Sequence, residues 1–164
     1  MTACHDAPVE RTGVTVAVVG TLNLDHTARV ARLPRTGEGV VGEVVAIGPG
    51  GKGANQAVAA ARLGAPTALI GCVGDDAAGT AVLDALAAEP GLDLGGVVRV
   101  AAPTGTAYVT IDGAGANTVV STRGANGWLD EEHVHRQGRA IAEAAVVLVQ
   151  RGVPDDAVRA TVDI

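Results

Sequence analysis

The amino-acid sequence predicts an α/β fold with a central, mostly parallel sheet, flanking helices and a small second β-sheet. Three observations support this prediction. A continuous apolar run at Thr15–Val19 is typical of a strand that is buried on both faces. Strand-like and helix-like segments then alternate through short connections, which favours right-handed βαβ crossovers. Two β-rich runs at 105–112 and 117–124 are separated by four small residues, which indicates a hairpin without a helix.

The first part of the chain supplies three strand-like segments and one helix. The apolar strand ends at Gly20, and polar residues interrupt an otherwise strand-like pattern in 21–30. The segment 40–47 is rich in β-branched residues and is again strand-like. The segment 54–64 is alanine-rich and ends at a glycine, with a proline two residues beyond, as helices commonly do.

The pattern continues through the second part of the chain. We predict a strand at 67–73 and a helix at 77–89, for which Asp75 or Asp76 is the candidate N-cap. The apolar face of that helix is expected to carry Val82, Leu83, Leu86 and Ala87. A polar-headed helix at 130–144, a buried strand at 145–150 and the first turns of one more helix at 154–164 complete the pattern.

Composition limits the class of protein. The chain has 164 residues, enough for one domain, and its two aromatic residues leave the core to Val, Ala and Leu. A net charge of −6 without a basic cluster argues against a nucleic-acid partner. Two cysteines, no apolar span of membrane length and no secretory leader indicate a cytoplasmic protein. We expect 1–13 to be a disordered tail and 14–164 to be the folded domain.

The stretch Gly48–Gln56, GPGGKGANQ, is the strongest candidate for a ligand-binding loop. It is not a Walker A loop, because Gly53 follows Lys52 where Ser or Thr is needed. A dinucleotide fingerprint remains open, since Gly48, Gly50 and Gly53 match GxGxxG and Asp75 follows about 20 residues on. The alternative needs no nucleotide, because glycines at a helix N-terminus let backbone N–H groups approach a ligand.

Polar side chains close to this loop suit a polyhydroxylated ligand. Lys52 and Asn55 would add hydrogen-bond donors to the glycine loop. Asp25 could accept from ligand hydroxyls, and Asn23 lies two residues earlier, on the same face of an extended segment. An Asx turn after the first strand is the structural alternative for this pair. We also interpret Trp128 as a packing anchor under the helix that follows it.

Five motifs occur in an order and spacing that resemble the N-terminal half of the ribokinase family, the PfkB-type carbohydrate kinases. They are GTLNLDH at 20–26, GGKGANQAVAAARLGA at 50–65, GCVGDDAAG at 71–79, PTGTAYVTID at 103–112 and RGAN at 123–126. The similarity runs from about residue 14 to 155 and is greatest to the members that convert D-ribose and ATP to ribose 5-phosphate and ADP. It implies a ribokinase-like fold with a β-sheet lid, formed by strands near 28–47 and 104–123, that covers the sugar and often mediates a homodimer.

The resemblance also implies roles for single residues. Asn23 and Asp25 would hold sugar hydroxyls, and Gly51, Lys52 and Asn55 would complete the sugar-binding site. No residue of this chain is assigned to catalysis, because the family's GAGD and NxxE motifs and its ATP pocket, which serve ATP and Mg²⁺, do not occur here. At Gln150–Gly152, where the family usually offers an acidic residue, this chain has none.

We therefore expect a truncated kinase that is inactive alone and that is marginally stable or oligomeric, because half a sheet leaves apolar surface uncovered. A non-catalytic sugar-binding or dimerisation module is the alternative, and a dinucleotide-dependent enzyme is the third reading.

Overall fold

The computed structural model describes residues 15–164, so the predicted tail at 1–13 lies outside the described residues. Its main sheet has four parallel strands in the order β5-β4-β1-β8. Their bounds are β1 Val16–Val19, β4 Thr67–Gly74, β5 Leu92–Val100 and β8 Val146–Val149. The central strand β1 pairs with β4 on one side and β8 on the other, which confirms the parallel sheet expected from its apolar sequence.

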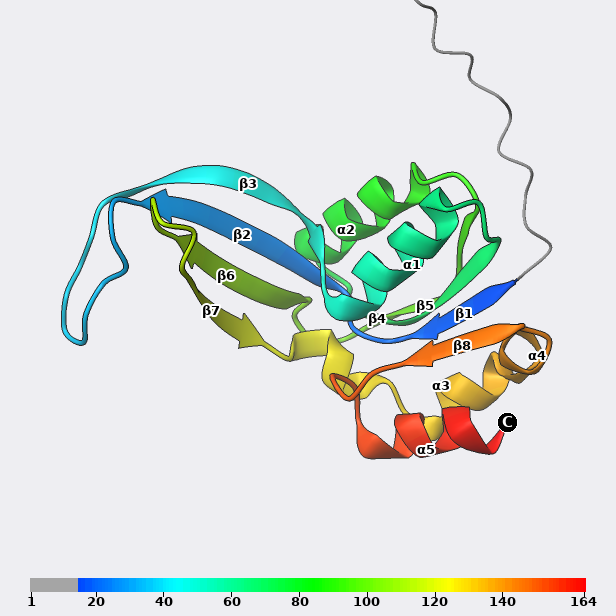
Figure 1. The fold of residues 1–164 in the computed structure, drawn as a ribbon. Coiled ribbons are helices and arrows are strands. Elements are labelled where there is room, and N and C mark those ends of the chain that lie inside the picture. Colours follow the sequence, from blue (N-terminus) through cyan, green and yellow to red (C-terminus); the bar gives the residue numbers. More distant parts are fainter. Residues whose placement is uncertain (1–14) are drawn as a thin grey trace, which may run out of the picture.

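Helices cover both faces of the main sheet (Figure 1). One face carries α1 Lys52–Arg62 and α2 Ala77–Ala87. The other carries the 3₁₀ helix η1 Gly124–Trp128 and helices α3 Glu131–Arg136, α4 Gly138–Ala142 and α5 Asp155–Asp163. Alternation along β1 divides the core in two, because successive side chains point to opposite faces. Val18 packs on the α1 and α2 side with Leu69 and Leu86, whereas Val19 packs on the α5 side with Ile70.

A second sheet extends away from the main one (Figure 1). Its strand order is β3-β2-β6-β7, with β2 Asn23–Val30, β3 Gly42–Gly50, β6 Gly105–Ile111 and β7 Asn117–Thr122. Strands β2 and β6 follow main-sheet strands β1 and β5 through short links and pair in parallel. The outer strands β3 and β7 pair with them antiparallel. We call this second sheet the lid sheet.

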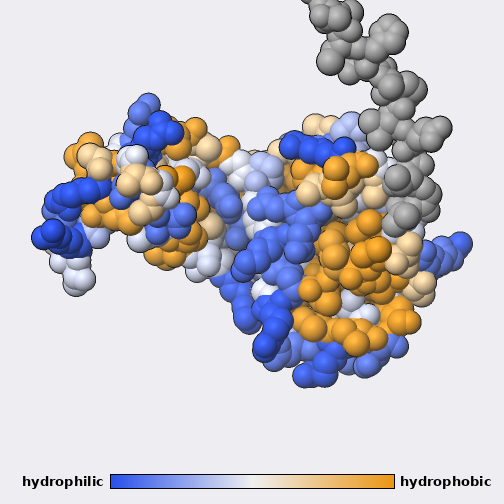
Figure 2. All heavy atoms as spheres, in the orientation of Figure 1, coloured by the Kyte–Doolittle hydropathy of each residue, from blue (hydrophilic) through white to orange (hydrophobic). Residues whose placement is uncertain are grey.

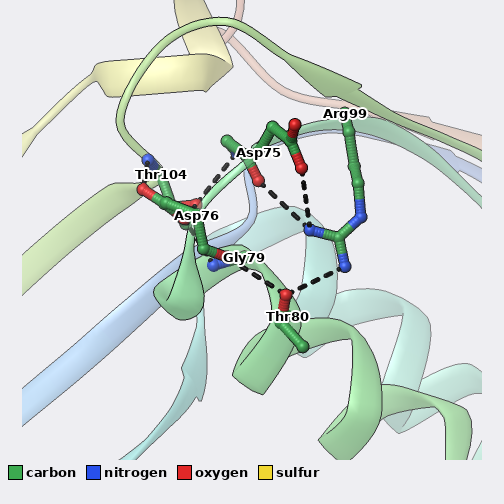
Figure 3. A network of polar contacts seen from close by, with 7 residues as sticks. Asp75, Asp76, Gly79, Thr80, Arg99 and Thr104 are labelled. Atoms are coloured by element: carbon green, nitrogen blue, oxygen red, sulfur yellow. Dashed lines mark hydrogen bonds and ion pairs between the residues drawn. The ribbon is translucent and has the colours of Figure 1, made fainter.

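One polar cluster ties the two sheets together (Figure 3). Asp76, the N-cap of α2, accepts from the backbone N–H of Gly79 at 2.7 Å. The same carboxylate accepts from the backbone N–H of Thr104 at 2.9 Å and from its hydroxyl at 2.6 Å. The Thr104 hydroxyl in turn accepts from the N–H of Gly74, the last residue of β4. Because Thr104 immediately precedes β6, this cluster fixes the entry of the lid sheet.

Several elements differ from the sequence-based expectation. Strand β5 was not predicted, because two glycines interrupt its apolar pattern. The expected helix at 130–144 is two short helices that meet at Gln137, followed by Gly138. Ala87 is exposed, so the buried stripe of α2 is narrower than predicted. Trp128 is 56% exposed and is not a packing anchor, because Leu129 takes the buried position at the end of η1.

Strand β8 is the other correction. It was predicted to be buried, yet Val146 and Val147 are exposed, because β8 pairs with β1 on one side only. Figure 2 shows hydrophobic side chains gathered on the face that carries β8. The exposed Val162 and Ile164 of the C-terminal segment lie along the same groove as Val147. We call this surface the β8 patch. No helix within residues 15–164 is both long and apolar enough to span a membrane.

Candidate functional site

A pocket of about 380 Å³ lies where the lid sheet meets the N-terminus of α1 and the end of β8. A pocket of this size suits a small polar metabolite. All five residues predicted from the sequence line it, namely Asn23, Asp25, Gly51, Lys52 and Asn55. The chain brings them together from two distant segments, because β2 pairs with β3 and β3 leads directly into α1.

Asp25 is the most unusual residue of the pocket. It lies near the start of β2, and its Oδ1 atom is buried without a hydrogen-bond partner among the described residues. Burial raises the pKa of this carboxyl above its ordinary value, and the neighbouring His26 opposes the rise only in part. A buried carboxylate oxygen without a partner costs free energy in the ligand-free protein and can accept a hydrogen bond from a bound molecule.

Two glycines of the 48–56 stretch are required by the local geometry, one by a close approach of the backbone to Asp25 and one by a turn. A Cβ atom on Gly50 would collide with the carboxylate of Asp25 on the neighbouring strand. Gly51 has a φ of 89°, a conformation that side chains disfavour, and it turns the chain from β3 into α1. The glycines therefore leave space beside the Asp25 carboxylate and turn the N-terminus of α1 toward the pocket.

The residues around the first turn of α1 are held by Thr21. Its hydroxyl accepts from the backbone N–H of Lys52 at 3.1 Å and from the side-chain amide of Gln150 at 3.1 Å. Gln150 directly follows β8, so one threonine connects the start of α1 to the end of the main sheet. Gly152 also lines the pocket, within the segment 150–152 where the family usually offers an acidic residue and this chain has none. No carboxylate reaches the pocket from that segment.

Asn126 is a buried positioning residue that the sequence analysis did not single out. Its Oδ1 accepts from the N–H of Leu22 at 2.8 Å, and its amide group donates to the carbonyl of Leu22 at 3.1 Å. The same amide donates to Oδ1 of Asn23 at 2.9 Å and to the carbonyl of Arg123 at 3.0 Å. Asn126 thus fixes the side chain of Asn23. The RGAN motif located it, but only the structure reveals this contact.

The outer wall of the pocket comes from the lid sheet. Ala107 pairs with Asp25 and with Ser121 across three strands, and all three line the pocket. Val119 and Arg123 of the β7 segment also line it. The sequence analysis singled out none of these side chains on or just after β7. Alternation along a strand shows which side chains share a face, but it does not show which face lines a pocket.

The acidic residue of the dinucleotide fingerprint lies outside this pocket. Among the described residues, no three His, Cys, Asp or Glu side chains are grouped to hold a metal ion. Asp75, the acidic residue of the dinucleotide fingerprint, does not line this pocket; its side chain is 81% exposed and lies 3.9 Å from Arg99.

The fold is that of an α/β protein with a polar pocket between its main sheet and its lid sheet. Residues 15–163 match the pfkB family carbohydrate kinase profile. The chain belongs to this family. It is 39% identical over 141 residues to the ribokinase of Haemophilus influenzae, an alignment that spans 85% of this chain and 46% of that protein. It is 38% identical over 142 residues to the ribokinase of Mus musculus, which spans 86% of this chain and 44% of the relative.

Solved structures show the same similarity. The Arabidopsis thaliana ribokinase complexed with ribose and ATP superposes with a TM-score of 0.72 at 32% identity, over 92% of this chain and 50% of that one. The Cryptococcus neoformans ribokinase in complex with ADP gives a TM-score of 0.77 at 31% identity, over 89% of this chain and 45% of that one. The ribokinase-like fold predicted from the motifs is thus confirmed, and the chain spans about half the length of the relatives that it matches.

Proposed function

We propose that this chain is the sugar-binding part of an ATP-dependent carbohydrate kinase of the ribokinase type, with D-ribose as the substrate. The observation that carries the proposal is the buried, unpartnered Oδ1 of Asp25, which lines a polar pocket. An ionised acceptor binds sugar hydroxyls through charge-assisted hydrogen bonds that are about twice as strong as neutral ones. Asn23, Lys52 and Asn55 supply further polar groups around the same pocket.

The proposal assigns sugar binding and orientation to this chain. Asp25 and Asn23 lie two residues apart on β2 and contact one side of a bound sugar. Gly51, Lys52 and Asn55 contact it from the first turns of α1. ATP and Mg²⁺ are the cosubstrate and metal of the proposed kinase, and the proposal assigns none of the described residues to either. We derive no phosphoryl-transfer step from these residues and propose that the chain alone does not phosphorylate ribose.

Calorimetric titration of the 164-residue chain with D-ribose tests the proposal. We expect saturable binding that Asp25→Ala weakens by about 10- to 100-fold, because a hydrogen bond to a charged group contributes about 1.5–3 kcal/mol. Asp93→Ala is the matched control, since Asp93 is an acidic residue that does not line the pocket. Absence of ribose binding, or equal binding by the Asp25→Ala variant, would contradict the proposal.

A second candidate is a non-catalytic sugar-binding module, which the polar lining of the same pocket supports equally well. Both candidates bind ribose, so activity must separate them. We expect no ADP release from ATP and ribose by the isolated chain in a coupled assay. A kinase role requires that ADP release appears when the chain is mixed with the C-terminal half of a ribokinase relative, and its continued absence would favour the binding module.

We further propose that the chain forms a homodimer through the outer face of the lid sheet and acts in the cytoplasm. His26 pairs with Ile47 on one neighbouring strand and with Tyr108 on the other, and Tyr108 pairs with Val120. These residues form a row on the face opposite Asp25, since side chains alternate along a strand. The three apolar members of the row are exposed, and the His26 and Tyr108 rings stack at 5.2 Å.

A further inference from the structure

Two polar side chains that line the pocket have no role in the sugar contacts proposed above. Thr21 lies in the link between β1 and β2, and Gln150 directly follows β8. Because β1 and β8 pair in parallel, the carboxyl ends of these strands lie side by side and bring the two residues together. The side-chain amide of Gln150 donates to the Thr21 hydroxyl at 3.1 Å. The two side chains thus form one polar unit at the end of the main sheet.

Two glycines make room for the Gln150 side chain. A Cβ atom on Gly20 would lie 2.9 Å from its Nε2 atom, and a Cβ atom on Gly152 would lie 2.6 Å from its Oε1 atom. Both distances are too short for a non-bonded contact, so the amide fills the space that the two glycines leave. A side chain confined in this way loses little rotational freedom when a ligand binds. The Gln150 amide is therefore preorganised at the wall of the pocket.

The hydroxyl of Thr21 is left with a proton to donate. Its oxygen accepts from the Gln150 amide and, at 3.1 Å, from the backbone N–H of Lys52. A hydroxyl has two lone pairs and one proton, so these two bonds use its whole capacity as an acceptor. Among the described residues, no group accepts a hydrogen bond from this hydroxyl. Thr21 therefore presents to the pocket a donor that two hydrogen bonds orient.

Gln150 supplies the matching acceptor. Its Nε2 atom donates to Thr21, and its Oε1 atom accepts no hydrogen bond from any of the residues that the structure describes. The side chain is half-buried and lines the pocket, so this oxygen is open to a ligand. A sugar hydroxyl accepts from one group and donates to another at the same time. A neighbouring donor and acceptor therefore suit a hydroxyl better than an ion, which would use only one of them.

We propose that Thr21 and Gln150 determine sugar specificity by binding one ligand hydroxyl, with Thr21 as the donor and Gln150 as the acceptor. This inference rests on the proposed sugar-binding function and adds a second hydroxyl-binding pair to Asn23 and Asp25. The first pair lies on β2 and the second at the ends of β1 and β8, so the two pairs bind different hydroxyls of the same sugar. Both members of the second pair are neutral, so its contribution does not vary with pH as that of Asp25 does.

Calorimetric titrations with D-ribose and with its analogues that each lack one hydroxyl, such as 2-deoxy-D-ribose, test the inference. We expect Thr21→Val, which keeps the shape of the side chain, to weaken ribose binding by about 3- to 10-fold, the usual contribution of a neutral hydrogen bond. One analogue should bind equally to the wild type and to Thr21→Val, because it lacks the hydroxyl that Thr21 contacts. The same analogue should still bind less tightly to Asp25→Ala than to the wild type.

Three further variants separate contact with the ligand from support of α1. Thr21→Ser retains the hydroxyl and should restore the affinity for ribose. Gln150→Met keeps the length of the side chain and leaves the bond from Lys52 to Thr21 in place, so it should show the same dependence on the analogue without disturbing α1. Thr80→Val is the control and should bind ribose as the wild type does, since Thr80 is exposed and does not line the pocket.

The analogues also separate the two proposals. Equal ribose affinity of the wild type, Thr21→Val and Gln150→Met would overturn this inference and leave the proposed function intact. A loss of equal size for ribose and for every analogue would overturn it too, because the pair would then only support the fold. If one analogue were insensitive to both Thr21→Val and Asp25→Ala, the two pairs would share a hydroxyl and the second pair would be refuted. Absence of ribose binding by the wild type would instead overturn the proposed function, and this inference with it.

Discussion

Asp25 has a higher free energy in the folded chain than it would have in water, because its carboxylate is partly desolvated and one oxygen has no partner. Residues that destabilise a fold in this way are commonly retained for binding or catalysis. The cost applies to the charged form, since burial raises the pKa of Asp25. Stability and ligand binding should therefore respond to this residue in opposite directions.

The first prediction concerns Asp25→Asn in the absence of sugar. We expect the variant to unfold at a higher temperature than the wild type at pH 7.5, by about 1 kcal/mol or less of added stability, because the unpaired charge is removed. The folded pKa is raised, so the penalty is fully present above that pKa and disappears as the pH falls below the unfolded value of about 3.9.

Thermal unfolding followed by circular dichroism at several pH values measures this effect. The advantage of Asp25→Asn should shrink as the pH is lowered, and Asp93→Asn should show no such trend. A variant that is less stable than the wild type at pH 7.5 would show that the carboxylate is a structural group.

Sugar binding should depend on the same ionisation of Asp25, but the charged form that destabilises the fold should strengthen binding. Because the ionised carboxylate accepts from the hydroxyls, we expect ribose affinity to weaken as the pH falls through the raised pKa of Asp25. The loss should begin at a higher pH than a solvated aspartate would give. Calorimetry between pH 4.5 and pH 7.5 measures it, and an affinity that is constant over this range would contradict the role of Asp25.

At the scale of elements, the lid sheet depends on the cluster around Asp76. This carboxylate caps α2 and also bonds twice to Thr104, which precedes β6. Hydrogen bonds from Thr104, first from its hydroxyl and then from its backbone, hold the pKa of Asp76 below its ordinary value. One side chain thus stabilises both a helix of the main domain and the entry to the lid.

We predict that Asp76→Ala lowers the free energy of unfolding by about 1–2 kcal/mol, which is the usual loss of a strong N-cap. Urea unfolding at pH 7 measures this change. The neighbouring Asp75→Ala is the matched control and should have an effect below about 0.5 kcal/mol, because its ion pair with Arg99 is exposed and long.

The depressed pKa fixes the pH dependence of the Asp76 effect. The stabilisation is fully present above the unfolded pKa of about 3.9 and is lost as the pH falls through the lower folded value. The unfolding free energies of the wild type and of Asp76→Ala should therefore converge in strong acid. Equal destabilisation by Asp75→Ala and Asp76→Ala would contradict the assignment of the cap.

The strands of the main sheet differ in how well their own sequences predict them. Strands with uninterrupted apolar runs, β1 and β4, were predicted because local pattern and tertiary burial agree there. Strand β5 was missed because its burial comes from pairing with β4, which its glycine-interrupted sequence does not signal. Strand β8 was predicted to be buried because its sequence is hydrophobic. Its exposure arises because, among the described residues, only β1 pairs with it, and its own sequence does not show this.

The candidate site shows the same division. Asn23, Asp25 and Lys52 belong to short motifs with recognisable chemistry, so they could be selected from the sequence. The contacts of Asn126 and Arg123 could not be predicted. Asn126 bonds to Leu22, about 100 positions away in the sequence, and Arg123 lines an open pocket. Contacts between distant segments are set by the strand order, which the sequence did not specify.

At the scale of the whole molecule, two apolar surfaces compete as sites of self-association. One is the outer row of the lid sheet, which contains Val120, and the other is the β8 patch, which contains Val147. Both are hydrophobic, and both border an unpaired strand edge, since β8 ends the main sheet and β3 and β7 end the lid sheet. Exposed strand edges bind other strands, and exposed apolar patches associate.

We predict that Val120→Glu converts the proposed dimer to a monomer in light scattering coupled to size-exclusion chromatography. Val120 is 67% exposed, so the glutamate is tolerated in the monomer and costs free energy only when it is buried between copies. Val41→Glu is the control, because Val41 is exposed outside the strands of the lid sheet.

The variant Val147→Lys tests the competing surface. If the lid sheet is the interface, Val147→Lys leaves the dimer intact and reduces only the association seen at high concentration. Loss of the dimer in Val147→Lys, with a dimer retained in Val120→Glu, would place the interface at the β8 patch instead.

The contact from Asn126 to Asn23 decides the polarity of the ligand's surroundings. Because the Asn23 oxygen already accepts from Asn126, the Asn23 amino group is the end left to face the pocket, as a donor beside the acceptor Asp25. A hydroxyl placed between them can therefore give its proton to one and lend a lone pair to the other. The substitution Asn126→Asp would turn the Asn23 amide over, so that its oxygen faces the pocket. The ligand hydroxyl would then meet two acceptors, Asn23 and Asp25, and could donate to only one of them.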